Sequence, residues 1–435
     1  MNNDRLVSVQ KLTQANLRVT LDEIKRVREV DASITESVRR ILGDVKSKGD
    51  QAVIEYSKKF DSVKLEEGRL RVSDDEVRDA YKKVTHEQVQ AIRGVKQRIE
   101  SVEKRLLQRL QGTLIKEDGI TIISTVKPVD SVGCYVPGGQ ASYPSSLMMT
   151  VVPAKVAGVP RVVVCSPLQM DVSMNPLLLV AANICGVDEF YRVGGAQAIG
   201  AMAYGTDTID AVSTVVGPGN IYVTEAKKMI SDRVVVDCPA GPTEILVVAD
   251  GSADPVLIVK DLVAQAEHGE TSICGLVTNS ESVAEKVSLM LSSLPETMMR
   301  RNIISKALSS NGFILVCEGL SLAVDFINSF APEHLEIVTS DPNKLAEKIT
   351  NSALVLIGPY SPAAASDYVL GTNHVLPTSG YAKTYSGLSI INYVRRVNIV
   401  QCSKEELNSL RKTVGILAES ERLPNHAASV EERFK

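Results

Sequence analysis

The feature that most constrains the fold is a series of short Val-, Ile- and Leu-rich runs that alternate with apolar helical segments. Four runs lie between residues 161 and 241, in "RVVVCSP", "EFYRVGG", "VSTVVGPG" and "RVVVDCPAG". A second series follows, in "EILVVAD", "CGLVTNS", "GFILVCE", "HLEIVTS" and "SALVLIG". Continuous β-branched runs separated by helices are typical of parallel strands covered on both faces. We therefore predict an α/β fold with two Rossmann-like domains.

The chain divides into four expected regions. They are a helical N-terminal region (1–110), a first α/β domain (111–237), a second α/β domain (238–378) and a helical C-terminal tail (379–435). In the tail, apolar residues recur three and four apart, at Leu407, Leu410, Val414 and Leu417. A lone amphipathic helix must bury such a stripe, either on its own domain or on a partner subunit.

Composition excludes several classes of protein. The 435 residues carry a formal net charge of −4, which argues against a general nucleic-acid binder. The start, "MNNDRLVSVQ", lacks the apolar core of a signal peptide, and no run of apolar residues is long enough to predict a membrane span. The seven cysteines form no CxxC pair and lie mostly in apolar runs, as expected of core residues in a reducing cytoplasm.

The stretch "DPVLIVKDLVAQAEHG" contains the first candidate site. Asp254 is placed to cap a helix, Pro255 suits its first turn, and Gly269 follows its expected end. Gln265 and His268 are three apart, so both side chains should lie on one face and could bind one Zn²⁺. The alternative is that His268 only interacts with the helix dipole.

The other histidines differ in their surroundings. His86 falls in the first turn of an expected charged helix and is interpreted as a surface residue. The remaining three stand in loops or at element ends near an acidic residue: Glu333 with His334, Asp367 with His374, and Glu421 with His426. Together they indicate a site with a metal, a base and a carboxylate.

Three glycine-rich loops follow strand-like runs in the first α/β domain. They are "CYVPGGQASYPSS" (134–146), "RVGGAQAIG" (192–200) and "VVGPGNIYVTEAKK" (215–228). Backbone amides at such a helix start can bind a phosphate, although the glycines could also serve only tight turns. Because no GxGxxG in a strand–turn–helix and no Walker motif occur, these loops by themselves indicate a nucleotide or phosphate and not specifically NAD.

Taken together, these motifs resemble those of the histidinol dehydrogenases. The resemblance rests on "VGCYVPGG", "VGGAQAIGAMAYGT", "VGPGNIYVTEAKK", "DCPAGPTEILVVAD", "DLVAQAEHG", "FAPEHLEI", "SDYVLGTNHVLPTSG" and "LAESERLPNHAASV", in this order. It implies a cytoplasmic, zinc-dependent homodimer of aldehyde-dehydrogenase-like α/β domains. The implied activity is the NAD-dependent four-electron oxidation of L-histidinol to L-histidine through bound L-histidinal, the last two steps of histidine biosynthesis.

The resemblance also implies roles for individual residues. The metal ligands would be Gln265, His268, Asp367 and His426, the last supplied by the partner subunit. The catalytic pair would be Glu333 and His334, and the NAD contacts Tyr135, Gln197 and Asn220. Substrate contacts would be Thr243, His374 and Glu421, together with His334 and the metal ligands. Many members have serine where this chain has Thr243, which keeps the hydroxyl and adds a methyl group.

Three other interpretations stay open at this stage. A related zinc dehydrogenase of the same fold could act on another small alcohol. An aldehyde dehydrogenase with a cysteine nucleophile would be sensitive to thiol alkylation and insensitive to chelators. A non-catalytic metal-binding protein would bind zinc and leave NAD⁺ unreduced.

Overall fold

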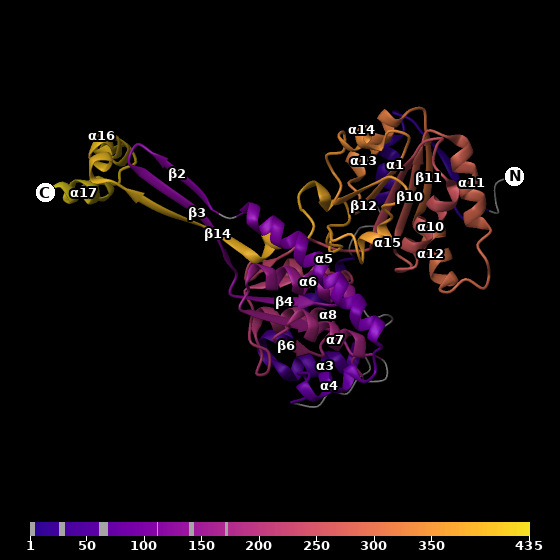
Figure 1. The fold of residues 1–435 in the computed structure, drawn as a ribbon, viewed down its shortest axis with the longest axis horizontal. Helices are drawn as coiled ribbons and strands as arrows, with labels where there is room; N and C mark the ends of the chain where they lie inside the picture. The colour runs from indigo at the N-terminus through magenta and orange to yellow at the C-terminus, as the bar shows by residue number, and fades with distance from the viewer. Residues whose placement is uncertain (1–4, 26–30, 61–67, 111, 139–142, 170–172) are drawn as a thin grey trace.

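The computed structural model describes residues 5–25, 31–60, 68–110, 112–138, 143–169 and 173–435. Two parallel sheets flanked by helices form the body of the molecule, and a narrow arm projects from it (Figure 1). This architecture confirms the predicted α/β fold with two parallel sheets. Within the described residues, no helix has the length and apolar character needed to cross a membrane.

The first sheet has five parallel strands in the order β6-β5-β4-β7-β8. Its strands are β4 (Ser131–Tyr135), β5 (Arg161–Cys165), β6 (Glu189–Tyr191), β7 (Thr214–Val216) and β8 (Val235–Val236). The helices around it are α2 (Ala32–Lys48), α3 (Asp50–Phe60), α4 (Asp74–Tyr81), α5 (His86–Leu110), α6 (Pro144–Ala157), α7 (Pro176–Cys185), α8 (Gly195–Tyr204) and α9 (Ile221–Met229). Helix α2 packs against α8 and α9, and α5 packs against α6 and α7, so N-terminal helices complete this core.

The second sheet has six parallel strands in the order β1-β11-β10-β9-β12-β13. Its strands are β1 (Val9–Leu12), β9 (Glu244–Ala249), β10 (Ile273–Thr278), β11 (Gly312–Cys317), β12 (His334–Val338) and β13 (Leu354–Ile357). The associated helices are α1 (Leu17–Lys25), α10 (Pro255–Ala266), α11 (Glu281–Ser292), α12 (Arg301–Asn311), α13 (Leu320–Phe330), α14 (Pro342–Ala346) and α15 (Ala363–Ser366). The N-terminal region, expected to be helical, thus also supplies β1, which pairs with β11.

Side-chain caps explain where several helices begin and glycines explain where some of them end. Asn175 accepts hydrogen bonds from the first amides of α7, and Asp254 caps α10 as predicted. Gly158 and Gly186 end α6 and α7 with φ of 82° and 79°, in the left-handed region that favours glycine. Local sequence therefore determines these boundaries.

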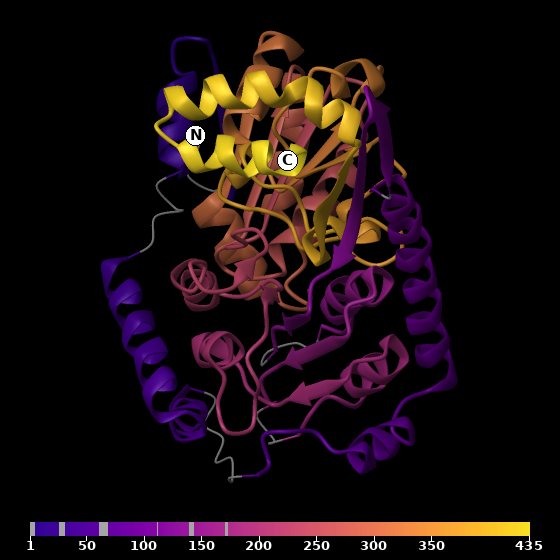
Figure 2. The same ribbon diagram turned by 90° about the vertical axis from the view of Figure 1, so that its left-hand side faces the viewer.

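The arm is a three-stranded antiparallel ribbon that carries two terminal helices. It consists of β2 (Thr113–Glu117), β3 (Ile120–Pro128), β14 (Val394–Cys402), α16 (Lys404–Ser420) and α17 (Pro424–Glu431). Short 3₁₀ segments lie at Tyr381–Lys383, Ile390–Tyr393 and Glu432–Phe434. Figure 1 shows α16 and α17 at the far end of the ribbon, and Figure 2 looks along the arm toward the body.

The arm leaves much of its apolar surface exposed. Ala418 is the only buried residue among the described residues of α16. Val400, Ile416 and Leu417 have exposed fractions of 61%, 54% and 56%. Within the predicted stripe of α16, Leu417 is exposed, and Leu407, Leu410 and Val414 are only partly buried in the single chain. Exposed apolar side chains of this kind favour burial.

A buried carboxyl group at the base of the arm yields a prediction about pH. Glu103 of α5 accepts a hydrogen bond of 2.8 Å from the Ile390 amide, beside the start of β14. Burial raises the pKa of Glu103 from 4.5 to about 7, against the opposing effect of that hydrogen bond. Because the folded state holds this proton more tightly than the unfolded state, the free energy of unfolding decreases as the pH rises through this window.

Replacement of Glu103 by glutamine should remove this decrease, because the amide oxygen still accepts from Ile390 and carries no charge. The variant should equal the wild type near pH 4.5 and exceed its stability by up to about 3 kcal/mol above pH 7. Urea unfolding at several pH values measures the difference. Glu100→Gln, in partly exposed ion pairs on the same helix, is the control and should show no such gain. Parallel pH profiles for wild type and Glu103→Gln would refute the prediction.

Candidate active site

The candidate site lies between the two sheets, at the amino ends of β9 and β12. The loop from Asp367 to Thr378 joins it to the first domain. Within that loop, the Nδ1 of His374 donates to the Asp367 carbonyl at 2.9 Å, and its Nε2 accepts from the Ser146 hydroxyl on α6 at 3.1 Å. Thr378 accepts a 2.6 Å hydrogen bond from the Gly241 amide just before β9. Residues from both domains therefore surround the site.

His334 is the first residue of β12, and Glu333 comes directly before it. The Oε2 of Glu333 accepts hydrogen bonds from the Thr243 hydroxyl at 2.6 Å and the Glu244 amide at 2.7 Å. His334 is 3% exposed, and its Nδ1 lies 3.1 Å from the Glu244 carbonyl. Because a carbonyl only accepts, Nδ1 must carry a proton, so Nε2 is the nitrogen that can take up another.

The Nε2 of His334 is a buried polar atom without a hydrogen-bond partner among the described residues. It lies 3.9 Å from Oδ1 of Asp367, and Nδ1 lies 3.5 Å from Oε2 of Glu333. Burial lowers the pKa of His334, but the Glu333 and Asp367 carboxylates outweigh this effect and raise it to about 9. A divalent cation beside Asp367 would oppose that rise, because it compensates the negative charge.

Three of the four predicted metal ligands come together in one chain. The Nε2 of His268 lies 4.0 Å from Oδ2 of Asp367, and Gln265 is 3% exposed in the last turn of α10. The Gln265 amide nitrogen donates to the Thr243 hydroxyl, which leaves its carbonyl oxygen as the donor atom for a cation. Helix α10 ends at Ala266, so His268 lies in the turn that follows and not within the helix as expected.

The chemistry of these donors fits a zinc ion in part. Imidazole nitrogen, carboxylate oxygen and amide oxygen are suitable ligands for zinc. Among the described residues, no group of three or more His, Cys, Asp or Glu side chains is arranged to hold a metal. His268 and Asp367 supply two such side chains, so the single chain presents an incomplete donor set.

The structure does not bring Glu421 and His426 to this site. Glu421 follows α16 and His426 lies in α17, and both side chains are exposed. Figure 1 places these helices at the tip of the arm, apart from β12 and α10. Within one subunit, the arm therefore separates these two predicted residues from the other substrate and metal residues.

The predicted cofactor residues lie at the carboxyl end of the first sheet, where dinucleotides bind in parallel α/β folds. Tyr135 ends β4, and its hydroxyl accepts a 3.1 Å hydrogen bond from the Gly195 amide at the start of α8. Asn220 caps α9 through the Tyr222 and Val223 amides. Gly217 has φ of 119°, and a Cβ there would lie 2.1 Å from the Tyr135 carbonyl oxygen, so the loop requires glycine.

Gln197 supports a polar ligand at this edge. It is 1% exposed, and neither its Nε2 nor its Oε1 has a hydrogen-bond partner among the described residues. Buried amides are normally satisfied, so an unpaired one beside a helix start fits a site for a polar group such as a dinucleotide. Part of the first glycine loop, residues 139–142, lies outside the described residues.

The cysteines do not offer a nucleophile at this site. Six of the seven are buried, and Cys402 is exposed on the arm. Burial raises the pKa of Cys134 to about 12 and also raises that of Cys238, the cysteine that precedes β9. Because the thiolate is the reactive form, these thiols are poor nucleophiles, which disfavours the cysteine-dependent interpretation.

Sequence reasoning missed two residues that shape the site. Glu244 holds His334 and Glu333 through its backbone, and its Oε1 accepts from the Ser379 amide at 2.9 Å. Ser146 contacts His374. An acidic residue inside an otherwise apolar strand run, as in "TEILVV", is a signal that could have revealed Glu244. Ser146 gives no comparable signal, because serine is common at helix starts.

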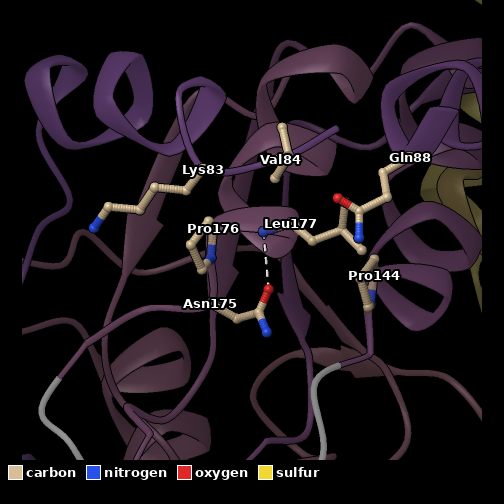
Figure 3. Close-up of a pocket in the computed structure, with 7 residues that line it drawn as sticks. All are labelled: Lys83, Val84, Gln88, Pro144, Asn175, Pro176 and Leu177. Atoms are coloured by element: carbon tan, nitrogen blue, oxygen red, sulfur yellow. Dashed lines mark hydrogen bonds between the residues drawn. The ribbon is translucent and has the colours of Figure 1, made fainter. Parts of the chain in front are cut away.

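A separate cavity of about 400 Å³ lies where α6 and α7 begin, beside Lys83 and Gln88 (Figure 3). None of its lining residues is acidic or a histidine, and none belongs to the predicted site. The side chain of Asn175 in its wall already caps α7 through the Leu177 amide. The predicted chemistry is therefore not placed in this cavity.

Comparisons with known proteins identify the family of this chain. The family model for histidinol dehydrogenase matches residues 24–434. The histidinol dehydrogenase of Methanosarcina mazei is 43% identical over 403 residues, 93% of this chain and 92% of that protein. That of Methanothermobacter thermautotrophicus is 42% identical over 98% of this chain and 100% of its own length. The crystal structure of histidinol dehydrogenase from Elizabethkingia anophelis matches with a TM-score of 0.91 and 33% identity, over 99% of this chain and 98% of that one. The chain therefore belongs to the histidinol dehydrogenase family.

Proposed function

We propose that this chain catalyses the NAD-dependent, four-electron oxidation of L-histidinol to L-histidine through bound L-histidinal. Within histidine biosynthesis, this reaction forms the last two steps. The observation that carries the proposal is the buried His334, whose Nε2 has no hydrogen-bond partner among the described residues and lies beside Asp367. Family membership supports the substrate, since the relatives share the name histidinol dehydrogenase.

In the first oxidation, His334 acts as the general base. Its hydrogen bond from Nδ1 to the Glu244 carbonyl orients the ring, so that Nε2 takes the hydroxyl proton of the alcohol. At the same time a hydride leaves the carbon that carries this hydroxyl group. NAD⁺, when bound, accepts that hydride and becomes NADH. The alcohol thus loses two electrons with the hydride and one proton to solvent through His334, and the aldehyde remains.

In the second oxidation, Glu333 acts on water. The hydrogen bonds from Thr243 and Glu244 both reach Oε2, so we assign Oε1 as the oxygen that takes a proton from the attacking water. Water adds to the aldehyde carbon to form a hydrate. His334 then removes a hydrate proton while the second hydride leaves, which gives a carboxylic acid. This acid loses its remaining proton to solvent and becomes the carboxylate of histidine. Overall, one water is consumed and two NADH are formed.

The residues assigned to hold the metal and the cofactor are those that the family resemblance implies, and the contacts described above support them. Gln265, His268 and Asp367 would bind zinc, and Tyr135, Gln197 and Asn220 would bind NAD. Zinc, when bound, supplies an anchor for the amine and imidazole of the substrate. The Thr243 hydroxyl, which links Gln265 to Glu333, and His374, fixed between Asp367 and Ser146, would contact the substrate.

We further propose a homodimer with shared active sites, in the cytoplasm. The exposed apolar side chains of the arm need a partner surface, and the site in the body lacks Glu421 and His426. Exposed apolar residues next to Asp367, including Tyr368 and Val369 at 56% and 51%, offer such a surface. The arm of a second copy would cover them and deliver the partner subunit's His426 to the metal. The buried, unpaired cysteines support a reducing compartment.

The test is the amount of NADH formed per L-histidinol consumed, followed by absorbance, with and without a chelator. Two NADH per substrate are expected, because two hydrides leave one carbon. Chelation should abolish the reaction and added Zn²⁺ should restore it. An absence of NADH from histidinol would refute the proposed function. Activity that survives complete metal removal would refute the role of the metal.

A further inference from the structure

Two carboxyl groups, one buried and one half-buried, lie one structural period away from the predicted site residues. On β12, His334 and Glu336 are two residues apart, so their side chains point to the same face of the sheet. On α10, Asp261 and Gln265 are four apart, one helical turn along the same face. Glu336 and Asp261 therefore form a second row behind His334 and Gln265.

The third element of this row is the short helix α15, which packs against α10. Its first amide, that of Ala363, donates a 2.6 Å hydrogen bond to Oε1 of Glu336. One turn later, the Asp367 amide donates to the Ala363 carbonyl at 3.1 Å. Ala363 therefore links Glu336 to Asp367 through two hydrogen bonds. A single carboxyl group on β12 thus fixes the helix that ends at Asp367.

The carboxyl groups of Glu336 and Asp261 are hydrogen-bonded to each other. Two carboxyl groups can form such a bond only when one of them carries a proton. Glu336 is 2% exposed and Asp261 is half-buried. Burial raises the pKa of both groups. The pKa of Glu336 rises to about 8, with the charge of Asp261 as a further cause, whereas the charge of His334 lowers it. One of the two carboxyl groups is therefore neutral and donates to the carboxylate of the other.

We propose that Asp261 and Glu336 form a proton-sharing pair that holds α10 and α15 against β12 and so sets the spacing of Gln265, His268 and Asp367. The inference rests on the proposed function, because zinc binding is itself proposed. Both are positioning residues, since neither belongs to the predicted ligand or catalytic set. Groups behind the ligands of a metal site commonly orient those ligands and change its affinity.

The test measures the zinc affinity of the full-length, metal-free protein, by titration of Zn²⁺ against a fluorescent competing chelator. Glu336→Ala and Asp261→Ala should each weaken binding by about 10- to 100-fold. The double variant should bind no more weakly than either single variant, because both remove the same interaction. Glu336→Gln should stay near wild type, since its amide can donate to Asp261 and accept from Ala363.

Asp250 offers a matched control at the opposite end of the same strands. This carboxylate, 9% exposed, accepts from the Ser252 amide at 2.9 Å and the Ser340 amide at 2.8 Å, and so links the far ends of β9 and β12. Asp250→Ala should lower the thermal midpoint without changing zinc affinity. If Glu336→Ala also lowered only the midpoint, the pair would be purely structural and the inference overturned. If Glu336→Gln and Glu336→Ala lost equal amounts of zinc affinity, the claim that the two carboxyl groups share a proton would be overturned.

Failure of the proposed pair and failure of the proposed function can be told apart. A wild-type protein that binds zinc but forms no NADH from histidinol would remove the proposed function and leave the pair testable by affinity alone. A wild-type protein with no measurable affinity for Zn²⁺ would overturn the inference directly.

Discussion

The His334→Asn variant is expected to oxidise L-histidinol about 100- to 10,000-fold more slowly than the wild type, the range typical for loss of a general base. Asparagine can keep the hydrogen bond to the Glu244 carbonyl that His334 makes through Nδ1. It lacks, however, a nitrogen that can take a proton at the position of Nε2. The loss should therefore appear in kcat, with little change in KM, when initial rates of NADH formation are measured. The residual rate should increase with pH as hydroxide replaces the missing base.

The same substitution at His86 provides the control. His86 lies on the exposed surface of α5, so His86→Asn should keep wild-type kcat and the wild-type thermal midpoint. A companion variant separates the two catalytic roles. Glu333→Gln should impair oxidation of added histidinal, because water activation is lost, while His334→Asn should impair both oxidations. Near-wild-type kcat in His334→Asn would contradict the assignment of the base.

Replacement of His426 by alanine is expected to weaken zinc binding by more than about 100-fold, since removal of a direct ligand should exceed the cost of losing a group behind it. Activity at limiting zinc should decrease in parallel. The expectation depends on the partner subunit, because the exposed His426 lies in α17, at the tip of the arm, whereas His268 follows α10 in the body (Figure 1). Equilibrium titration with Zn²⁺ and steady-state NADH formation measure the two effects.

Mixing subunits tests whether the site is shared. Co-expressed His426→Ala and His334→Asn subunits should form mixed dimers in which one of the two sites combines a normal body with a normal arm. With random pairing of symmetric subunits, about a quarter of all sites would be intact and activity should return to about that fraction of wild type. If His426 acted within its own subunit, each chain would stay defective and mixing would restore nothing.

The sequence allowed the parallel strands to be predicted because their pattern is local. The runs in "EILVVAD" and "HLEIVTS" became β9 and β12, and the Asp254 cap lies where its spacing indicated. Strand and helix periods act over a few residues, so no distant partner is needed to recognise them. The motif containing Glu333 and His334 could be located in the same way, although its catalytic role stays a prediction.

The tertiary structure alone decided which segments lie side by side. Pairing of β1 with β11, and of β14 with β3 from Val394↔Pro128 to Cys402↔Ile120, joins parts of the chain that no local pattern connects. Likewise, the hydrogen bonds from Thr243 to Glu333 and from Gln265 to Thr243 depend on how β9, β12 and α10 pack. The position of His426, at the end of an arm outside the body, follows from the same long-range pairing of β14 with β3. Such contacts depend on burial summed over the whole chain, whereas a sequence pattern reports only which face of each segment must be buried.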